Sequence, residues 1–304
     1  MKNFERLVND PELPRVRHRL DVFCDENPSK VTLFVCLMKE KTKKMYKMAY
    51  SKFRDICDAN CIRFDSIEIT TDQERNLFTC FSETFWDCSI DHVTCKKHFT
   101  SNLELNLGKL GLKKYITKKG NDFSPDFFIF YEQVKLLVLL PSYLILPMLS
   151  HLIEKIENKV DGIDHFLVYL QNRITTVCAN HMSFFERILK SKKYVHQTTN
   201  ASESLNGHLN RFIFSLSKSR KLTTISRHLR TFYISDFRRL EEQFLVKKSD
   251  YEPSPNAQIN YNRAKNFIRK IIKIGTYPNK TCLRKISLLM EPSYFFGDKN
   301  SNPE

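Results

Sequence analysis

Three short segments carry side chains whose types and spacing could support chemistry. The first runs from Ile69 to Glu74 with the sequence ITTDQE, and it places the Asp72 carboxylate at the end of an expected strand. Open α/β sheets build their sites at such strand ends. The same residues also fit a capping box of Thr71 and Glu74, with Asp72 in the first turn of a helix. The segment therefore predicts either a site carboxylate or a helix start.

The second segment is a C-x-x-H motif formed by Cys95 and His98. Such a motif can be half of a zinc site, but zinc normally needs three or four protein ligands. The further candidates, His92 or the pair Cys178 and His181, make no recognised finger spacing. Zinc is therefore disfavoured, and a buried cysteine beside a hydrogen-bonded histidine is the preferred interpretation.

The third segment reads TTNASESLN, from Thr198 to Asn206, and continues into an expected helix. Glu203 lies near the start of that helix. Asn200 as N-cap, with Glu203 three residues later, is the capping alternative. This segment alone does not show whether Glu203 is a carboxylate of a functional site or part of a helix cap.

Alternating elements are expected to position these segments. Short apolar runs alternate with stretches of helical periodicity, which predicts an α/β sheet. Strands are predicted at 31–38, 67–72 and 90–94, and helices at 45–56, 77–85 and 99–110. A Leu-, Phe- and Ile-rich helical block follows.

Five segments are predicted along the chain. They are a charged N-terminal segment (1–20), an α/β core (21–112), a long all-helical insertion (113–195), return helices that complete the core (196–246), and a linker, basic C-terminal helix and tail (247–304). The most apolar run, 136–149, contains two prolines and is too short to span a bilayer. It is predicted to be buried core, so no membrane partner is expected.

Charge points to a polyanionic partner. The 304 residues include 49 Lys and Arg against 34 Asp and Glu, a formal net charge of +15 at pH 7. Nucleic acid is the first expectation for such a surplus. With only 7 glycines, a glycine-looped nucleotide enzyme is disfavoured, and the 9 cysteines are expected to be reduced thiols. DNA-binding candidates follow the third segment: Lys218, Arg220, Lys221, Arg227 and Arg230. A solvated helix face is the alternative for this cluster.

The order of the three segments resembles the transposase domain of Mutator-like elements (MULE), a family with an RNase H-like fold and a D-D-E metal site. TTDQER looks like the family's second-Asp motif, and Cys95 with His98 matches its C-x-x-H. TTNASESLNGHLNR is similar to its T-N-N-x-x-E segment, where the third acid lies. The resemblance covers about residues 21–245.

This resemblance implies an RNase H-like mixed sheet flanked by helices and interrupted by the helical insertion. It implies that Asp72 and Glu203 are catalytic and bind Mg²⁺ or Mn²⁺, whose preference for hard oxygen ligands these carboxylates meet. Cys95 and His98 would be structural residues of the motif. Asn200 and Asn206 would support the third segment.

One departure concerns the family's first Asp, which lies on the first strand in a D-G-T-F/Y sequence. No such sequence is present, and the acids Asp10, Asp21 and Asp25 lack the right neighbours. The Asp161-Gly162 pair lies in the expected insertion. We therefore expect a chain that has lost, or begins after, the first strand, and that also lacks the N-terminal zinc-finger DNA reader of many relatives.

The expected function is that of a nuclear, transposase-derived DNA-binding protein, ancestrally active in metal-dependent DNA cleavage and strand transfer during transposition. Its partner would be transposon ends or non-specific duplex DNA. The sequence leaves open whether the chain forms a homo-oligomer. The first alternative is a domesticated or decayed protein that binds DNA without cutting it, which the missing D-G-T sequence favours. The second is a zinc-dependent interaction module.

Overall fold

The structure is a computed structural model. It describes residues 42–72, 75–118, 120–157, 159–175, 181–191, 254–275 and 277–296, and positions 195, 227, 230, 231, 234, 235 and 238. The chain divides into two compact units. One comprises Met1–Ile67, Thr79–Ser89 and Asn200–Glu252, and the other comprises Glu68–Phe78, Ile90–Thr199 and Pro253–Glu304.

The first unit contains α3 (Lys43–Ala59) and the C-terminal half of α4 (Arg75–Thr84). α3 begins after Thr42, whose hydroxyl accepts a hydrogen bond from the Met45 backbone N–H at 3.3 Å and caps the helix. Aromatic rings join the two helices, with Tyr50 set edge-on against Phe81 at 5.2 Å between centroids. The predicted helix at 45–56 is confirmed.

Two parallel strands form the sheet of the described residues, β1 (Ser66–Thr71) and β2 (Ser89–Thr94), with α4 between them in sequence. The register is read from two hydrogen bonds. Ser89 N donates to Asp65 O at 3.1 Å, and Cys95 N donates to Thr71 O at 2.7 Å, so both strands advance in the same direction. The predicted strands at 67–72 and 90–94 and the predicted helix between them are confirmed.

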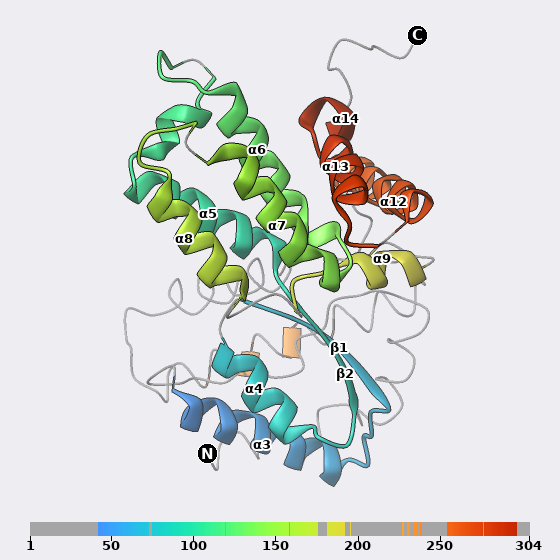
Figure 1. The fold of residues 1–304 in the computed structure, drawn as a ribbon. Helices are drawn as coiled ribbons and strands as arrows, with labels where there is room; N and C mark the ends of the chain where they lie inside the picture. The colour runs from blue at the N-terminus through green and yellow to red at the C-terminus, as the bar shows by residue number, and fades with distance from the viewer. Residues whose placement is uncertain are drawn as a thin grey trace. The chain divides into compact units, whose positions relative to one another are not determined.

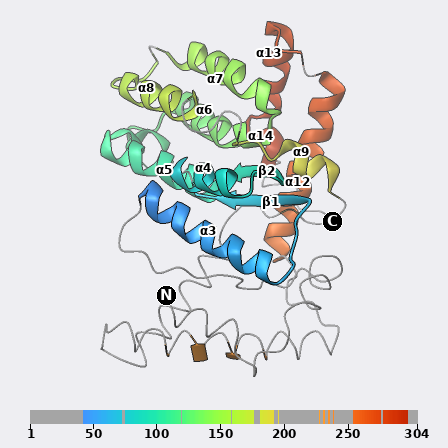
Figure 2. The same ribbon diagram turned by 90° about the horizontal axis from the view of Figure 1, so that it is seen from below.

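The second unit continues with a run of helices (Figure 1). Their bounds are α5 (Lys96–Lys109), η2 (Leu112–Ile116), α6 (Pro125–Leu136), η3 (Leu137–Leu139), α7 (Ser142–Ile156), α8 (Asp164–Arg173) and α9 (Phe185–Lys190). The short η elements are 3-10 helices. α6 packs on α7, and both views show α6, α7 and α8 side by side (Figures 1 and 2).

Three helices close this unit: α12 (Pro255–Ile274), α13 (Lys280–Leu289) and α14 (Pro292–Phe296). α12 packs on α9 and α13, and α13 packs on α7. α12 begins eight residues before the expected start of the basic helix at Arg263, and α13 and α14 lie where a polar tail was expected. Ser254 caps α12 through a hydrogen bond from Ala257 N at 3.3 Å.

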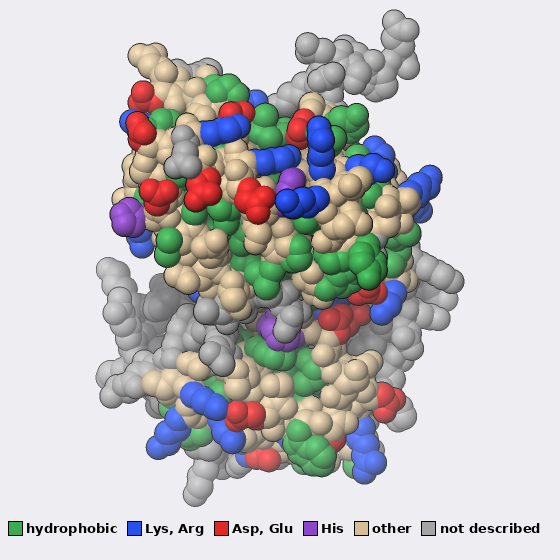
Figure 3. Space-filling view, in the orientation of Figure 1, with side chains coloured by type: hydrophobic (Ala, Val, Ile, Leu, Met, Phe, Trp, Pro, Cys, Tyr) green, Lys and Arg blue, Asp and Glu red, His purple; other side chains and the backbone are tan. Residues whose placement is uncertain are grey.

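A continuous apolar core runs through these helices. The predicted buried run 136–149 is confirmed as core, since Leu137, Leu139 and Leu140 are fully buried and Pro147 lies inside α7. On the face drawn in Figure 3, side chains of both charge signs lie scattered among apolar and uncharged groups. Among the described helices, none combines the length and hydropathy that crossing a bilayer requires.

Candidate functional site

The candidate site lies where the two strands end. Parallel strands place their carboxyl ends at the same edge of a sheet. β1 ends at Thr71 and β2 ends at Thr94, and the bond from Cys95 N to Thr71 O holds these two ends together. Asp72 follows β1 directly, while Cys95 is the N-cap residue of α5.

Asp72 and His98 meet at this edge. His98 Nδ1 lies 3.0 Å from Asp72 Oδ1, with the two side chains 32% and 47% exposed. His98 is in the first turn of α5, so the same helix start that buries Cys95 completely also points its histidine at the carboxylate. The structure therefore brings together the first two segments singled out in the sequence.

The expected capping role of Thr71 is wrong, because Thr71 is the last residue of β1 and Asp72 follows it. Glu74, the other half of the expected capping box, lies outside the described residues. The Thr71 hydroxyl donates to Asp72 O at 2.9 Å and lies 2.7 Å from Nε2 of His92. Since the hydroxyl proton is used, we assign the proton of this second contact to His92 Nε2.

A layer of rings lies under this edge. Phe78 stacks on His92 with 3.9 Å between centroids and 7° between planes. His181 lies 4.9 Å from His92 between centroids, and its carbonyl accepts a hydrogen bond from Thr94 N at 2.6 Å. The layer supports the backbone that carries Asp72.

The rings of this layer are uncharged. Burial lowers the pKa of His92 to about 3, and the nearby His181 and Arg187 act in the same direction. Burial also lowers the pKa of His181. Neither imidazole is suited to proton transfer near neutral pH, because both hold the neutral form there. Their contribution is structural.

Arg187, on α9, anchors the helical block to the strands. Its side chain is 6% exposed, and its Nε donates to Asp91 Oδ2 at 2.6 Å. The guanidinium also donates to Thr70 Oγ1 at 3.0 Å, to Ile69 O at 3.1 Å and to Asp91 O. No local sequence signal predicted this residue, because its partners lie 96 or more residues away.

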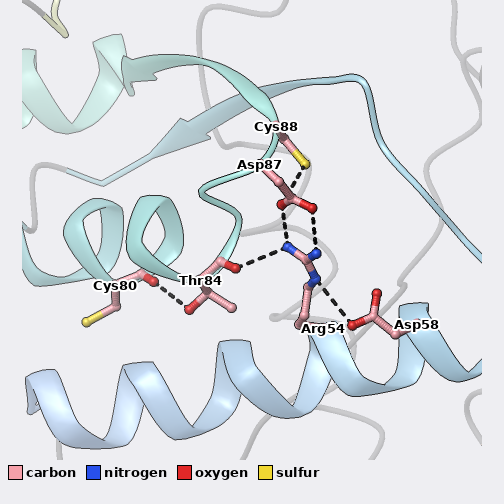
Figure 4. A network of polar contacts seen from close by, with 6 residues as sticks. All are labelled: Arg54, Asp58, Cys80, Thr84, Asp87 and Cys88. Atoms are coloured by element: carbon pink, nitrogen blue, oxygen red, sulfur yellow. Dashed lines mark hydrogen bonds and ion pairs between the residues drawn. The ribbon is translucent and has the colours of Figure 1, made fainter.

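A pocket of about 310 Å³ lies in the first unit. Arg54 lines it and pairs with both Asp87 oxygens at 2.5 and 2.6 Å, while its Nε contacts Asp58 at 3.3 Å (Figure 4). The guanidinium is therefore already neutralised. Burial raises the pKa of the pocket thiol Cys57 to about 11, so it stays protonated and is a weak nucleophile. The pocket lacks an activated group among its described residues.

The remaining predicted residues are placed as follows. Arg227 and Arg230 are helical and exposed. Glu203, Asn200, Asn206, Lys218, Arg220 and Lys221 lie outside the described residues, as does the expected strand at 31–38. Within the described part, no group of three or more His, Cys, Asp or Glu side chains could hold a metal ion.

Comparison with known proteins gives no relative. No family model, no curated protein and no solved structure matches the chain.

Proposed function

We propose that this chain is a MULE-type, transposase-derived DNA-binding protein, and that β1, α4, β2 and α5 belong to an RNase H-like fold. One observation carries the proposal: Asp72 and His98 are in contact at the carboxyl ends of adjacent parallel strands. Two segments that resemble the family in sequence thus share one place in the structure. A helix-capping role for Thr71 would not require that contact.

Asp72 fits a divalent metal as one ligand. Its carboxylate offers the hard oxygens that Mg²⁺ and Mn²⁺ prefer, and its side chain is about half exposed. The contact with His98 is made by Oδ1. A complete ligand set needs residues outside the described part, and Glu203 is the candidate that the sequence provides.

The chain's own residues position that ligand. The His98 contact holds the orientation of the Asp72 carboxylate, as an outer hydrogen bond does in many metal sites. The Thr71 hydroxyl fixes the Asp72 carbonyl, and the buried His92 fixes Thr71. When bound, a pair of Mg²⁺ ions supplies an activated nucleophile and stabilises the leaving oxygen in DNA strand transfer.

DNA as the partner is supported by charge. The net charge of +15 favours a polyanion, and phosphate contacts dominate the affinity of proteins for duplex DNA. A nuclear location follows from a DNA substrate.

The test is Mn²⁺-dependent nicking of labelled duplex DNA by the full chain. Asp72→Asn is expected to abolish nicking, because the amide keeps the shape of the side chain but loses the charge that holds a metal. Asp161→Asn is the matched control, because it removes an exposed acid from the segment that connects α7 to α8. This variant is expected to nick DNA like the wild type.

Glu203→Gln is the companion variant. It is expected to lose nicking as well, while a cap at this position would contribute only about 1 kcal/mol to stability. Gross unfolding of this variant would show a buried structural role instead. No nicking by the wild type, with DNA binding intact, would mean a scaffold that has lost its chemistry. Absence of DNA binding would overturn the proposal.

A further inference from the structure

The last helices of the second unit form a segment without acids. Between Ser254 and Met290 the sequence contains no Asp or Glu. It contains eight Lys and Arg: Arg263, Lys265, Arg269, Lys270, Lys273, Lys280, Arg284 and Lys285. This segment is α12 and α13, which are packed helices and not a loose tail.

Packing fixes the direction in which α12 presents its charges. One face is buried in the core: Tyr261, Ala264, Phe267, Ile268 and Ile271. The opposite face is exposed along the helix: Asn262, Asn266, Arg269, Lys270 and Lys273. These positions recur at helical spacing, so amides occupy the middle of the exposed face and cations its C-terminal part. The resulting surface, with the exposed Lys280, Arg284 and Lys285 of α13, is called here the α12–α13 basic face.

Some cations elsewhere in the described chain are paired with acids, whereas two of this face are not. Lys43 pairs with Glu83 at 2.8 Å, and Lys159 pairs with Asp126 at 3.1 Å. Lys270 and Lys273 form no ion pair with any described residue, although they lie three residues apart on one helix. Like charges at this spacing repel and destabilise a helix unless an anion lies between them.

More positive charge joins the face from α7. Lys155 donates to the Ser287 hydroxyl at 2.9 Å, on the turn of α13 next to Arg284. Burial lowers the pKa of Lys155. The positive charges of Arg284 and Lys159 lower it as well, whereas the carboxylate of Glu291 raises it. Figure 3 shows Lys and Arg side chains gathered over the region where Figure 1 draws α13 and the end of α12.

We propose that the α12–α13 basic face binds the sugar–phosphate backbone of duplex DNA. Lysine and arginine bind phosphate by charge, and asparagine amides donate hydrogen bonds to phosphate oxygens. Twenty residues of α12 span about 30 Å, close to one helical turn of DNA. The proposal rests on the proposed DNA-binding function and assigns it to a surface outside the Asp72 site.

The test compares two double variants of the full chain that remove the same charge. Lys270→Gln with Lys273→Gln removes two cations of the face. Lys44→Gln with Lys109→Gln removes two exposed lysines on α3 and α5. Glutamine keeps high helix propensity, so both proteins are expected to fold. Their melting temperatures check this.

Affinity for a labelled duplex of about 30 base pairs is measured by fluorescence anisotropy between about 50 and 200 mM salt. The α12 double variant is expected to bind about tenfold more weakly, and its plot of log affinity against log salt should be less steep by about 2. The control double variant should keep the wild-type slope.

Three results would overturn the proposal. Equal losses in both double variants would mean that only net charge matters, and wild-type affinity in the α12 variant would place the contact elsewhere. In either case the DNA-binding function itself would stand. A wild-type chain that does not bind the duplex would overturn both.

Discussion

At the residue scale, Asp72 and His98 meet because Asp72 directly follows β1 and His98 lies in the first turn of the helix that follows β2. The two strands are parallel and in register, so the end of one fixes the end of the other. These residues were predictable because their signals are local: a strand, an acid, and a C-x-x-H before a helix. Phe78, His92 and His181 were not predicted as one layer, because their contacts join separate segments of the chain.

His92 makes stability depend on pH. Burial lowers its pKa to about 3 in the folded protein, against an ordinary value of 6.5. As the pH falls below 6.5, His92 becomes protonated in the unfolded chain but stays neutral in the folded chain. The folded state therefore loses stability relative to the unfolded state. Between about pH 7 and pH 5 this one group is expected to lower the free energy of unfolding by about 2 kcal/mol. Urea unfolding across this range measures it.

The control is His92→Phe, which keeps a ring to stack on Phe78 and removes the titrating nitrogens. Loss of the contact with Thr71 lowers the free energy of unfolding at every pH. Loss of the titrating imidazole changes only the slope of the free energy of unfolding against pH. Between about pH 6 and pH 4 the slope is expected to decrease by about 1.4 kcal/mol per pH unit. A variant with the wild-type slope would contradict the assignment to His92.

At the scale of the elements, one side chain joins α9 to both strands. Arg187 is buried and donates to Asp91, Thr70 and Ile69. Arg187→Ala is expected to lower the free energy of unfolding by about 3 kcal/mol, because it removes a buried charge and leaves backbone carbonyls without donors. Chemical denaturation followed by circular dichroism measures the loss.

Two further variants test whether geometry or charge matters at this anchor. The Asp91 side chain is 53% exposed and can be hydrated, so Asp91→Asn should cost only about 1 kcal/mol. Arg187→Lys should not restore stability, because one ammonium cannot replace the planar guanidinium with its several donors. Full rescue by lysine would show that charge alone holds α9 in place.

The C-terminal helices begin at residues other than those predicted from the sequence. The polar residues before Arg263 favoured a linker, yet Ser254 and Pro255 form a helix start with a capping serine and a proline at the first position. α13 begins in a similar way at Asn279, whose side chain accepts from Cys282 N at 2.8 Å. Both helix starts have local sequence signals. The burial of Tyr261 and Ile286, which stabilises the two helices, has no local signal, because it depends on helices that are distant in the sequence.

At the scale of the whole molecule, positive charge is distributed unevenly along the sequence. The chain has a net charge of +15, and eight of its cations lie on α12 and α13 without a single acid between Ser254 and Met290. A uniform surplus would produce only weak, diffuse attraction for DNA. A surplus concentrated on one packed helix pair neutralises neighbouring phosphates together and releases their counterions together.

This concentration sets a limit on how steeply DNA binding should depend on salt. Each phosphate that a cation neutralises contributes about −0.9 to the slope of log affinity against log salt, so the six cations of the α12–α13 basic face allow a slope no steeper than about −5. Anisotropy titrations of the full chain with duplex DNA measure it. A steeper slope would require further contacts, for which Arg227 and Arg230 are exposed candidates. Affinity that does not change with salt would rule out phosphate contact, because counterion release is unavoidable when cations neutralise a duplex.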